Sequence, residues 1–247
     1  MGVVAIIPAR LNAERFPGKV LARETGRPLV MHVVESARAC RSIDRVVVAT
    51  DSDRVCAALG SGGSGGVECV LTSASHANGT SRLGEAADLL GLGAQDIVVN
   101  VQGDEPEIEA GAVDGAVALL TQGGFEMTTA CAPIESKREH LDPNVVKVVL
   151  AQDGSAMYFS RAPIPYPRAQ GVTPLRHIGL YVYRVGFLER YRDMEPTPLE
   201  RCERLEQLRA LGHGVRIGVH VAPRAWAGID TPEQYSDFVK RWNTRQK

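Results

Sequence analysis

Three cationic residues just after the first apolar segment could bind a polyphosphate. The run Val3–Ile7 stops at Pro8, and the loop that follows carries Arg10, Arg15 and Lys19. Fixed positive charges grouped in one loop suit the oxygens of phosphate groups. Neither GxxxxGK(S/T) nor GxGxxG occurs in this loop, so the common mononucleotide- and dinucleotide-binding motifs are excluded here.

Two aspartates are candidate ligands for a magnesium ion. Asp104 comes just after the apolar run Ile97–Val101, and Asp230 lies in the segment Gly228–Pro232. Mg²⁺ prefers one or two carboxylates together with phosphate oxygens and water. Each aspartate also has a plainer interpretation, Asp104 as a helix N-cap or turn residue and Asp230 as a charge near a helix N-terminus.

Lysine and magnesium together supply what nucleotidyl transfer requires. An acceptor oxygen attacks the α-phosphorus while pyrophosphate leaves, and negative charge gathers on the non-bridging oxygens. Positioning and electrostatic stabilisation account for most of such catalysis. The set Arg10, Lys19 and Asp104 is therefore predicted to act on a nucleoside triphosphate.

A third segment, Ser75–Arg82, could hold a nucleoside. Asn78 and Gly79 predict a tight turn, and Thr80 can cap the helix that follows. Small residues at such a turn let a flat base approach the backbone closely. The alternative is a plain turn and cap, and His76 is predicted to form hydrogen bonds or pack rather than bind a metal.

The second half of the chain carries polar groups that would suit an acidic second substrate. They lie in Ser160-Arg161 and in the segment Arg176–Tyr181. Taken alone, Arg161 could equally be a surface residue and His177 a core histidine with satisfied hydrogen bonds. A serine hydrolase is not supported, because no GxSxG motif occurs.

The elements that must position these residues alternate between strand and helix through the first half. Strands are predicted at Val3–Ile7, Val46–Thr50, Glu68–Leu71, Ile97–Val101 and Met127–Ala132, and helices at Pro28–Cys40, Asp53–Leu59, Ser81–Leu90 and Ala110–Leu120. This order predicts an α/β fold with a mostly parallel sheet and helices on both faces. The catalytic candidates then lie at the carboxyl ends of strands, where such sheets bind ligands.

The second half predicts antiparallel strands and a long helix. Strands are expected at Val145–Leu150, Ala156–Phe159, His177–Tyr183 and Val215–Val221. A continuous helix is expected over Leu199–Leu211, because apolar residues recur there at every third position. A last helix is expected from Thr231-Pro232, with threonine as N-cap.

Composition limits the class of protein. The 247 residues are 44% hydrophobic and 23% charged with a formal net charge of −1, which is typical of a globular protein and gives no support for a nucleic-acid partner. No apolar segment reaches the roughly 20 residues that a membrane helix needs. The five cysteines show no CxxC spacing, so we expect free thiols, without a zinc site or disulfide, and a cytoplasmic protein.

Taken in order, these motifs resemble one enzyme family. The chain is similar to the cytidylyltransferases typified by CMP-Kdo synthetase, or 3-deoxy-manno-octulosonate (Kdo) cytidylyltransferase. The similarity spans nearly the whole chain and is carried by IIPAR, RFPGK, VVVATD, NGTSRL, IVVNVQGDEP, NVVKVV, YFSRAPIPYPR, HIGLYVYR, PLERCERLEQLRAL and GIDTPE.

The resemblance implies a Rossmann-like nucleotidyltransferase fold of three layers in a single domain. Residues 1–132 and 213–247 would form the nucleotide-binding core, and residues 133–212 a small antiparallel region for acceptor binding and dimerisation. The family further implies CTP, Mg²⁺ and a homodimer. The reaction would transfer CMP from CTP to a small acidic acceptor, Kdo, and release pyrophosphate.

Site residues follow from the same resemblance. Arg10, Arg15 and Lys19 are expected to hold the triphosphate, with Lys19 facing the transferred phosphate, and Asp104 and Asp230 to bind magnesium. The residues expected to frame the cytosine and ribose are Pro8, Ala9, Asn78, Gly79, Thr80 and Arg82. Those expected to face the acceptor are Gln102, Arg161, His177, Tyr181 and Glu206.

The chain departs from the family pattern in three places. Ala13-Glu14 replaces the usual Ser-Thr, Asn78 replaces a serine, and the connection Pro167–Leu175 is short. A small acceptor would fit these changes, so the alternative to Kdo, which stays the leading expectation, is a small phosphonate such as phosphonoformate, activated by the same chemistry.

Overall fold

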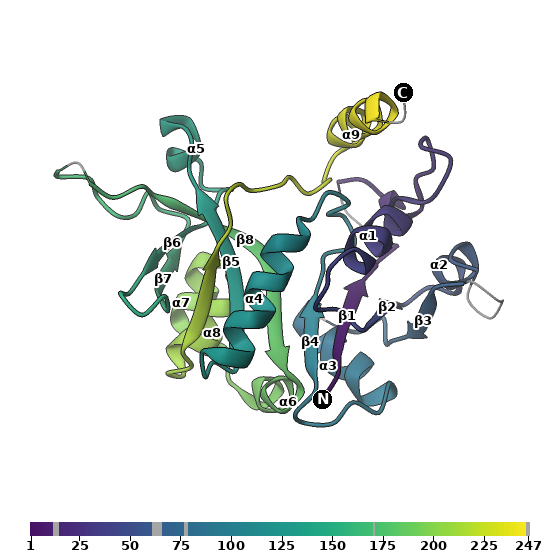
Figure 1. Ribbon diagram of the computed structural model, residues 1–247, viewed down its shortest axis with the longest axis horizontal. Helices are drawn as coiled ribbons and strands as arrows, with labels where there is room; N and C mark the ends of the chain where they lie inside the picture. The colour runs from purple at the N-terminus through teal and green to yellow at the C-terminus, as the bar shows by residue number, and fades with distance from the viewer. Residues whose placement is uncertain (12–14, 61–65, 77–78, 170, 246–247) are drawn as a thin grey trace. The chain divides into compact units, whose positions relative to one another are not determined.

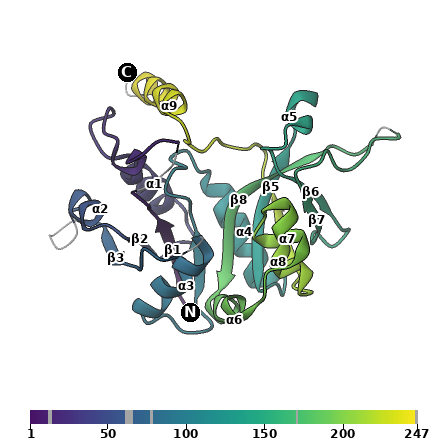
Figure 2. The same cartoon turned by 180° about the vertical axis from the view of Figure 1, so that it is seen from behind.

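The computed structural model describes residues 1–11, 15–60, 66–76, 79–169 and 171–245, and Figures 1 and 2 show it from two sides. The chain forms two compact units. Unit 1 comprises Met1–Ala110 and Trp226–Lys247, and unit 2 comprises Gly111–Ala225. The functional division expected from the resemblance, with boundaries after residues 132 and 212, concerns nucleotide and acceptor binding and stays a prediction.

Unit 1 contains a parallel sheet. Its strands are β1 (Val3–Pro8), β2 (Arg45–Thr50), β3 (Glu68–Leu71) and β4 (Ile97–Asn100), in the order β3-β2-β1-β4. The interiors of β1, β2 and β4 are buried. This is what apolar runs without alternation predict, since a strand covered on both faces needs apolar side chains on both.

The helices of unit 1 are α1 (Leu29–Arg38), α2 (Asp53–Ala58), α3 (Gly79–Leu89) and the C-terminal α9 (Pro232–Arg245). The chain moves outward from β1 to β2 and β3, then returns past β1 to β4. Right-handed connections place the helices of the outward path on one face and α3 on the other. The predicted α/β arrangement of layers is thus present.

Helix α9 packs on an apolar cluster of unit 1. Leu29, Ile229, Tyr235 and Phe238 are buried together, and the ring of Phe16 lies 5.7 Å from that of Tyr235. The cluster therefore joins the cationic loop, through Phe16, to the segment that carries Asp230.

Unit 2 contains a mixed sheet. Strand β5 (Met127–Pro133) runs antiparallel to β8 (Leu175–Arg184) and parallel to β9 (Ile217–Val221). Strands β6 (Lys147–Leu150) and β7 (Ala156–Ser160) form an antiparallel pair, and β6 also pairs with β8. The predicted antiparallel region is present.

One helix of unit 2 corrects a sequence prediction. The helices are α4 (Ala110–Gln122), α5 (Lys137–Leu141), α6 (Val185–Asp193), α7 (Pro198–Glu203) and α8 (Gln207–Gly212). The continuous helix expected over Leu199–Leu211 is wrong, because Arg204 adopts a left-handed conformation with φ 53° and ends α7. Residues spaced strictly by three do not stay on one face of a helix that has 3.6 residues per turn. Leu199 is accordingly exposed, while Leu208 is buried.

The cysteines supply a second correction. Cys56 of α2 and Cys69 of β3 form a disulfide, with Cα atoms 5.6 Å apart, where free thiols were expected. The pairing depends on how α2 lies beside β3, which the spacing of cysteines along the chain does not reveal. Cys40 and Cys131 are buried free thiols, as expected, and Cys202 is exposed.

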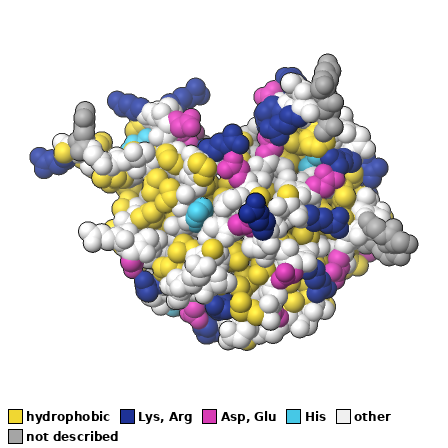
Figure 3. All heavy atoms as spheres, in the orientation of Figure 1, with side chains coloured by type: hydrophobic (Ala, Val, Ile, Leu, Met, Phe, Trp, Pro, Cys, Tyr) yellow, Lys and Arg dark blue, Asp and Glu magenta, His cyan; other side chains and the backbone are white. Residues whose placement is uncertain are grey.

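Surface charges of both signs are interspersed on the face shown in Figure 3. Among the residues that the structure describes, no helix is both long enough and apolar enough to cross a membrane.

Candidate active site

The candidate site lies where the strand order of unit 1 reverses. Strands β1 and β4 are parallel neighbours, so the loops after Pro8 and Asn100 leave the same edge of the sheet. Sheets of this type bind ligands at such a reversal. The two loops touch: a Cβ atom added to Gly103 would lie 2.7 Å from the carbonyl oxygen of Pro8, so the close approach requires glycine.

The cationic loop turns back sharply before Lys19. Gly18 has φ +72°, which favours glycine, and its N–H donates to the carbonyl of Leu11 at 2.9 Å. The residues Lys19–Leu21 then form a short 3-10 helix. This turn carries the Lys19 side chain inward, where the residue is only 7% exposed.

Lys19 is the centre of the site. Its ammonium donates to Asp104 Oδ2 at 2.5 Å, to the carbonyl of Ile229 at 2.8 Å and to Asp230 Oδ1 at 3.2 Å. Arg15 Nη2 lies 2.9 Å from the other oxygen of Asp230. Four of the predicted site residues are thus brought together, with two cations and two carboxylates in contact.

Asp230 is positioned by the start of α9. The backbone N–H groups of Asp230 and Thr231 donate to Gln234 Oε1 at 2.7 Å and 3.0 Å, which fixes the first turn. The N–H of Ile229 donates to the carbonyl of Asp104 at 2.8 Å. The interpretation of Asp230 as a charge near a helix N-terminus is confirmed, since it lies just before the start of α9, whereas its role as a magnesium ligand stays a prediction.

In the described residues, no group of three or more histidine, cysteine, aspartate or glutamate side chains is arranged to hold a metal ion. Asp104 and Asp230 nevertheless reach the same ammonium from two loops. Their carboxylate oxygens are of the type that Mg²⁺ takes as its one or two protein ligands, with phosphate oxygens and water completing the set.

Of the segment Ser75–Arg82, which is expected to hold the nucleoside, residues 77 and 78 lie outside the described residues, and Asn78 is one of them. Ala13-Glu14 also lies outside them. Gly79 begins α3, and Thr80 is buried. Ala9 is also buried, with its N–H donating to the carbonyl of Ala49 at 2.9 Å.

Arg82 is held by protein groups. It is 1% exposed and donates to Thr72 Oγ1 at 2.6 Å and to Asp51 Oδ2 at 3.0 Å. Sequence reasoning missed Asp51 and Thr72. Asp51 directly follows the apolar strand β2, just as Asp104 follows an apolar run, so the same rule could have found it. His76 contacts Glu85 and lies 3.1 Å from Ser81 Oγ, in the hydrogen-bonding role expected.

The residues predicted to face the acceptor are divided between the units, with Gln102 in unit 1 and the other four in unit 2. His177 Nε2 lies 2.9 Å from Thr129 Oγ1, and its ring lies 5.4 Å from that of Tyr181. Burial lowers the pKa of His177. Burial, followed by the nearby Tyr183 and Glu206, raises the pKa of Tyr181. His177, Tyr181 and Glu206 thus share one neighbourhood.

Arg161 is anchored by backbone carbonyl groups. Its Nε donates to the backbone carbonyl of Glu203 at 2.7 Å, and its Nη1 donates to the carbonyl of Pro143 at 3.0 Å. The Glu203 carboxylate accepts from Ser160 Oγ at 2.6 Å and from the Arg161 N–H at 2.9 Å. Glu203, which sequence reasoning missed, therefore fixes the end of β7.

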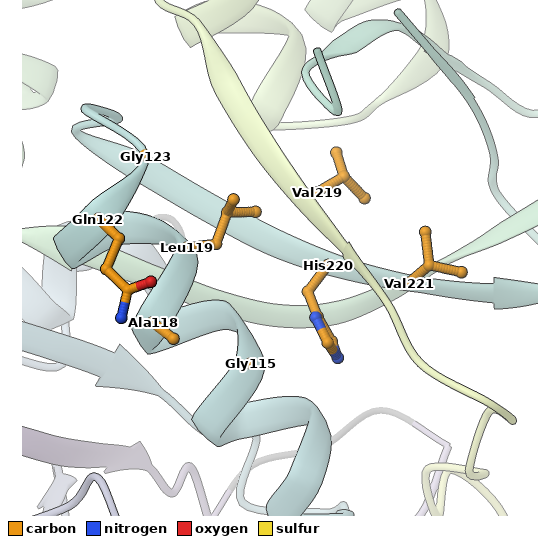
Figure 4. A pocket seen from close by; sticks show the side chains of 8 residues that line it. All are labelled: Gly115, Ala118, Leu119, Gln122, Gly123, Val219, His220 and Val221. Atoms are coloured by element: carbon orange, nitrogen blue, oxygen red, sulfur yellow. The ribbon is translucent and has the colours of Figure 1, made fainter. Parts of the chain in front are cut away.

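A shallow hollow of about 470 Å³ lies between α4 and β9 in unit 2. Figure 4 shows its lining, where His220 lies beside Gly115 of α4. A Cβ atom at Gly115 would overlap the His220 ring, so this glycine allows the helix and strand to approach. None of the predicted site residues lines this hollow.

Comparison with known proteins identifies the family of this chain. The sequence profile of a family described as cytidylyltransferase matches residues 4–217. A 3-deoxy-manno-octulosonate cytidylyltransferase of Acidovorax sp. (strain JS42) is 48% identical over 245 residues, covering 92% of each chain. The enzyme of that name from Syntrophobacter fumaroxidans is 47% identical over 243 residues, covering 97% of this chain and 96% of its own.

A solved structure confirms the predicted fold class. It is a CMP:2-keto-3-deoxy-manno-octonic acid synthetase complexed with CTP, and it matches with a TM-score of 0.92 and 34% identity over 99% of this chain and 100% of that one. The mixed α/β architecture is therefore that of a nucleotidyltransferase. On the profile match, the identities and this structural similarity together, the chain belongs to the cytidylyltransferase family.

Proposed function

We propose that this protein transfers CMP from CTP to Kdo and releases pyrophosphate. The observation that carries the proposal is the meeting of Lys19 with Asp104 and Asp230 at the strand reversal of unit 1. The site combines a cation for phosphate oxygens with two carboxylates for a metal ion. The relatives that share this sequence pattern are named for the same reaction.

The phosphates of CTP would be held by Arg10, Arg15 and Lys19. Arg15 is exposed and Arg10 is half-buried, so both arginines border solvent from which a triphosphate can approach. The cytidine would lie against Pro8, Ala9, Gly79 and Thr80, together with Asn78. Arg82 would support this wall from beneath, since its guanidinium is bound to Asp51 and Thr72.

Asp104 and Asp230 would hold Mg²⁺. A bound divalent ion screens the negative charge of the triphosphate and stabilises the charge that gathers as pyrophosphate leaves. Lys19 would then exchange a carboxylate partner for an oxygen of the transferred phosphate. Because the ammonium already sits in a fixed, nearly buried position, little reorganisation accompanies that exchange.

The acceptor would be recognised by Gln102, Arg161, His177, Tyr181 and Glu206. The lowered pKa of His177 keeps its imidazole neutral near pH 7, so it would act there as a hydrogen-bonding group. An acceptor oxygen forms a bond to the α-phosphorus while the bond from that phosphorus to pyrophosphate breaks.

Pyrophosphate release in the presence of Mg²⁺ tests the proposal. CTP with Kdo is expected to give turnover, whereas CTP alone and CTP with phosphonoformate serve as controls. The relatives favour Kdo over a small phosphonate, because three of them at 47–48% identity are named 3-deoxy-manno-octulosonate cytidylyltransferase. Turnover with phosphonoformate but not with Kdo would reverse the assignment of the acceptor.

A homodimer in the cytoplasm completes the proposal. Unit 2 exposes Met157, Tyr166 and Val172, which are 61%, 82% and 73% exposed. Large apolar side chains that are exposed in the single chain can be buried when two chains associate. Light scattering during gel filtration should give twice the mass of the chain, and a monomer would contradict this part. The cytoplasmic location rests on the supply of CTP there.

A further inference from the structure

Trp226 and Glu105 form a hydrogen bond beside the two candidate metal ligands. Trp226 Nε1 donates to Glu105 Oε2 at 2.7 Å, and both side chains are half-buried. Glu105 directly follows Asp104, and Trp226 lies in the segment that leads to Asp230. The bond therefore joins the two loops that present the carboxylates.

Further contacts between these loops lie next to this bond. Gly228 faces Glu105, since a Cβ atom there would lie 3.6 Å from Glu105 Cγ. The N–H of Ile229 donates to the Asp104 carbonyl at 2.8 Å, and the Ile229 carbonyl accepts from Lys19 at 2.8 Å. The segment from Trp226 to Asp230 is thus fixed along its length against the loop after β4.

Trp226 is also the first residue of the segment that returns to unit 1. Its bond to Glu105 anchors the chain at the point where it leaves unit 2. Within unit 1, Asp230 is held through this bond and through the first turn of α9.

We propose that the Trp226–Glu105 pair is a positioning device that sets Asp230 relative to Asp104 for divalent-metal binding. The inference rests on the proposed function for its metal. Neither residue touches the reacting atoms, and both act through the aspartates. A hydrogen bond to a carboxylate fixes a donor more strongly than one to a neutral group. The indole N–H is therefore the decisive atom, rather than the ring.

Trp226→Phe removes that N–H and keeps an aromatic ring. Direct binding of Mn²⁺ to the whole chain, followed by the electron paramagnetic resonance signal of the free ion, is expected to weaken about tenfold, the effect of losing one hydrogen bond to a charged group. Glu105→Ala should weaken binding similarly, and the double variant no more than either single one. Glu105→Gln, whose neutral amide oxygen can still accept, should bind Mn²⁺ more tightly than Glu105→Ala.

Trp242→Phe is the matched control, because Trp242 packs in α9 on His32 and takes part in none of the hydrogen bonds described above between the two loops. It is expected to leave Mn²⁺ binding unchanged. In turnover assays, high Mg²⁺ should restore the kcat of Trp226→Phe, as expected for a displaced ligand.

Wild-type Mn²⁺ affinity in both Trp226→Phe and Glu105→Ala would overturn the inference, as would a wild-type chain that binds no Mn²⁺. If Trp226→Phe fails to fold, Glu105→Ala against Glu105→Gln decides alone. The binding measurement contains neither CTP nor Kdo. Failure of the proposed acceptor would therefore appear only in the turnover assay, and the two failures are distinguishable.

Discussion

Lys19 Nζ lies 2.5 Å from Asp104 Oδ2, although the two residues are 85 positions apart in the chain. The contact arises because β1 and β4 are adjacent and parallel, so the loops after them meet. The Lys19 side chain is 9% exposed, and a buried charge is stable only when it is paired. The ammonium thus compensates both carboxylates.

Lys19→Met tests this role, since it removes the charge and keeps an unbranched side chain. The kcat/KM for CTP should fall about 10²–10³-fold, the range seen when one donor to a developing negative charge is lost. Mg²⁺ should also raise the Tm of the variant more than that of wild type, because both carboxylates have lost a cation. Pyrophosphate release and thermal melts with MgCl₂ or EDTA measure the two effects.

Lys240→Met is the control for that substitution, because Lys240 is 73% exposed on α9 and pairs only with the surface residue Asp237 among the contacts described. It should leave kcat/KM unchanged. Equal activity of Lys19→Met and Lys240→Met would exclude Lys19 from the site.

Asp104→Asn separates a metal-binding role from a structural one. The amide keeps the shape of the side chain, and Lys19 retains the Ile229 carbonyl and Asp230 as acceptors. Pyrophosphate release should be lost at millimolar Mg²⁺, while the Tm measured in EDTA stays near that of wild type. A large drop in Tm would instead make Asp104 a structural residue.

Gly103→Ala should disturb the site without touching a charge. The new Cβ would lie 2.7 Å from the Pro8 carbonyl oxygen, and backbone must shift to relieve the overlap. We expect a loss of about 1–3 kcal/mol of stability, as for overpacking of a well-packed site, together with a higher KM for CTP. Chemical denaturation and steady-state kinetics measure both quantities.

Gly111→Ala supplies the comparison for Gly103→Ala. Gly111 lies in α4, where a Cβ atom would meet nothing within 4 Å. Alanine there should stabilise the protein by about 0.5–1 kcal/mol, because it favours a helix. Equal effects of the two substitutions on stability would show that the close approach of Gly103 to Pro8 does not require glycine.

The sequence predicts the strands of unit 1 well, and the reason is physical. Strands β1, β2 and β4 are covered on both faces, so each appears as an uninterrupted apolar run. The carboxyl ends of such runs then locate Lys19 and Asp104 near one edge of the sheet. The contact of Lys19 with the Ile229 carbonyl could not be predicted, because every residue carries a backbone carbonyl whatever its side chain.

Other features of the fold depend on contacts that local patterns do not contain. Helix α7 ends because Arg204 adopts a left-handed backbone conformation, which the spacing of leucines does not predict. The disulfide requires α2 to lie beside β3, and the anchoring of Arg161 requires Glu203 to reach β7. The disulfide and the anchoring of Arg161 are tertiary contacts between different elements, and secondary-structure propensities contain no information about such contacts.

The disulfide between Cys56 and Cys69 should stabilise unit 1 by restricting its unfolded chain. A loop closed across 13 residues contributes about 3 kcal/mol in the chain-entropy description. Dithiothreitol should therefore lower the Tm of wild type, and the variant Cys56→Ser with Cys69→Ser should match the reduced protein. Cys202→Ser, at an exposed free thiol, is the control and should not change the response. An unchanged Tm on reduction would contradict the expected contribution.

His32 should make the protein sensitive to mild acid. It is 2% exposed on α1, with its ring 5.1 Å from Phe238 and 4.4 Å from Trp242 of α9. Burial, and then the nearby Arg27, lower its pKa from 6.5 to about 4. The unfolded chain therefore binds the proton first, so the stability that neutral His32 contributes is complete above about pH 6.5 and is lost as the pH falls toward 4.

His32→Gln isolates this contribution, because glutamine can still bond to Thr25 and does not titrate. Wild type should lose up to about 3 kcal/mol relative to the variant between pH 6.5 and 4, from the shift of its pKa. His177 and His220, whose pKa values are also lowered by burial, are present in both proteins and cancel in the comparison. Urea denaturation at half-unit steps of pH measures the difference, and parallel curves for wild type and His32→Gln would refute it. His32 packs against α9, which begins beside Asp230. CTP-dependent turnover of wild type should therefore fall over the same pH interval, and turnover of the variant should fall only at a lower pH.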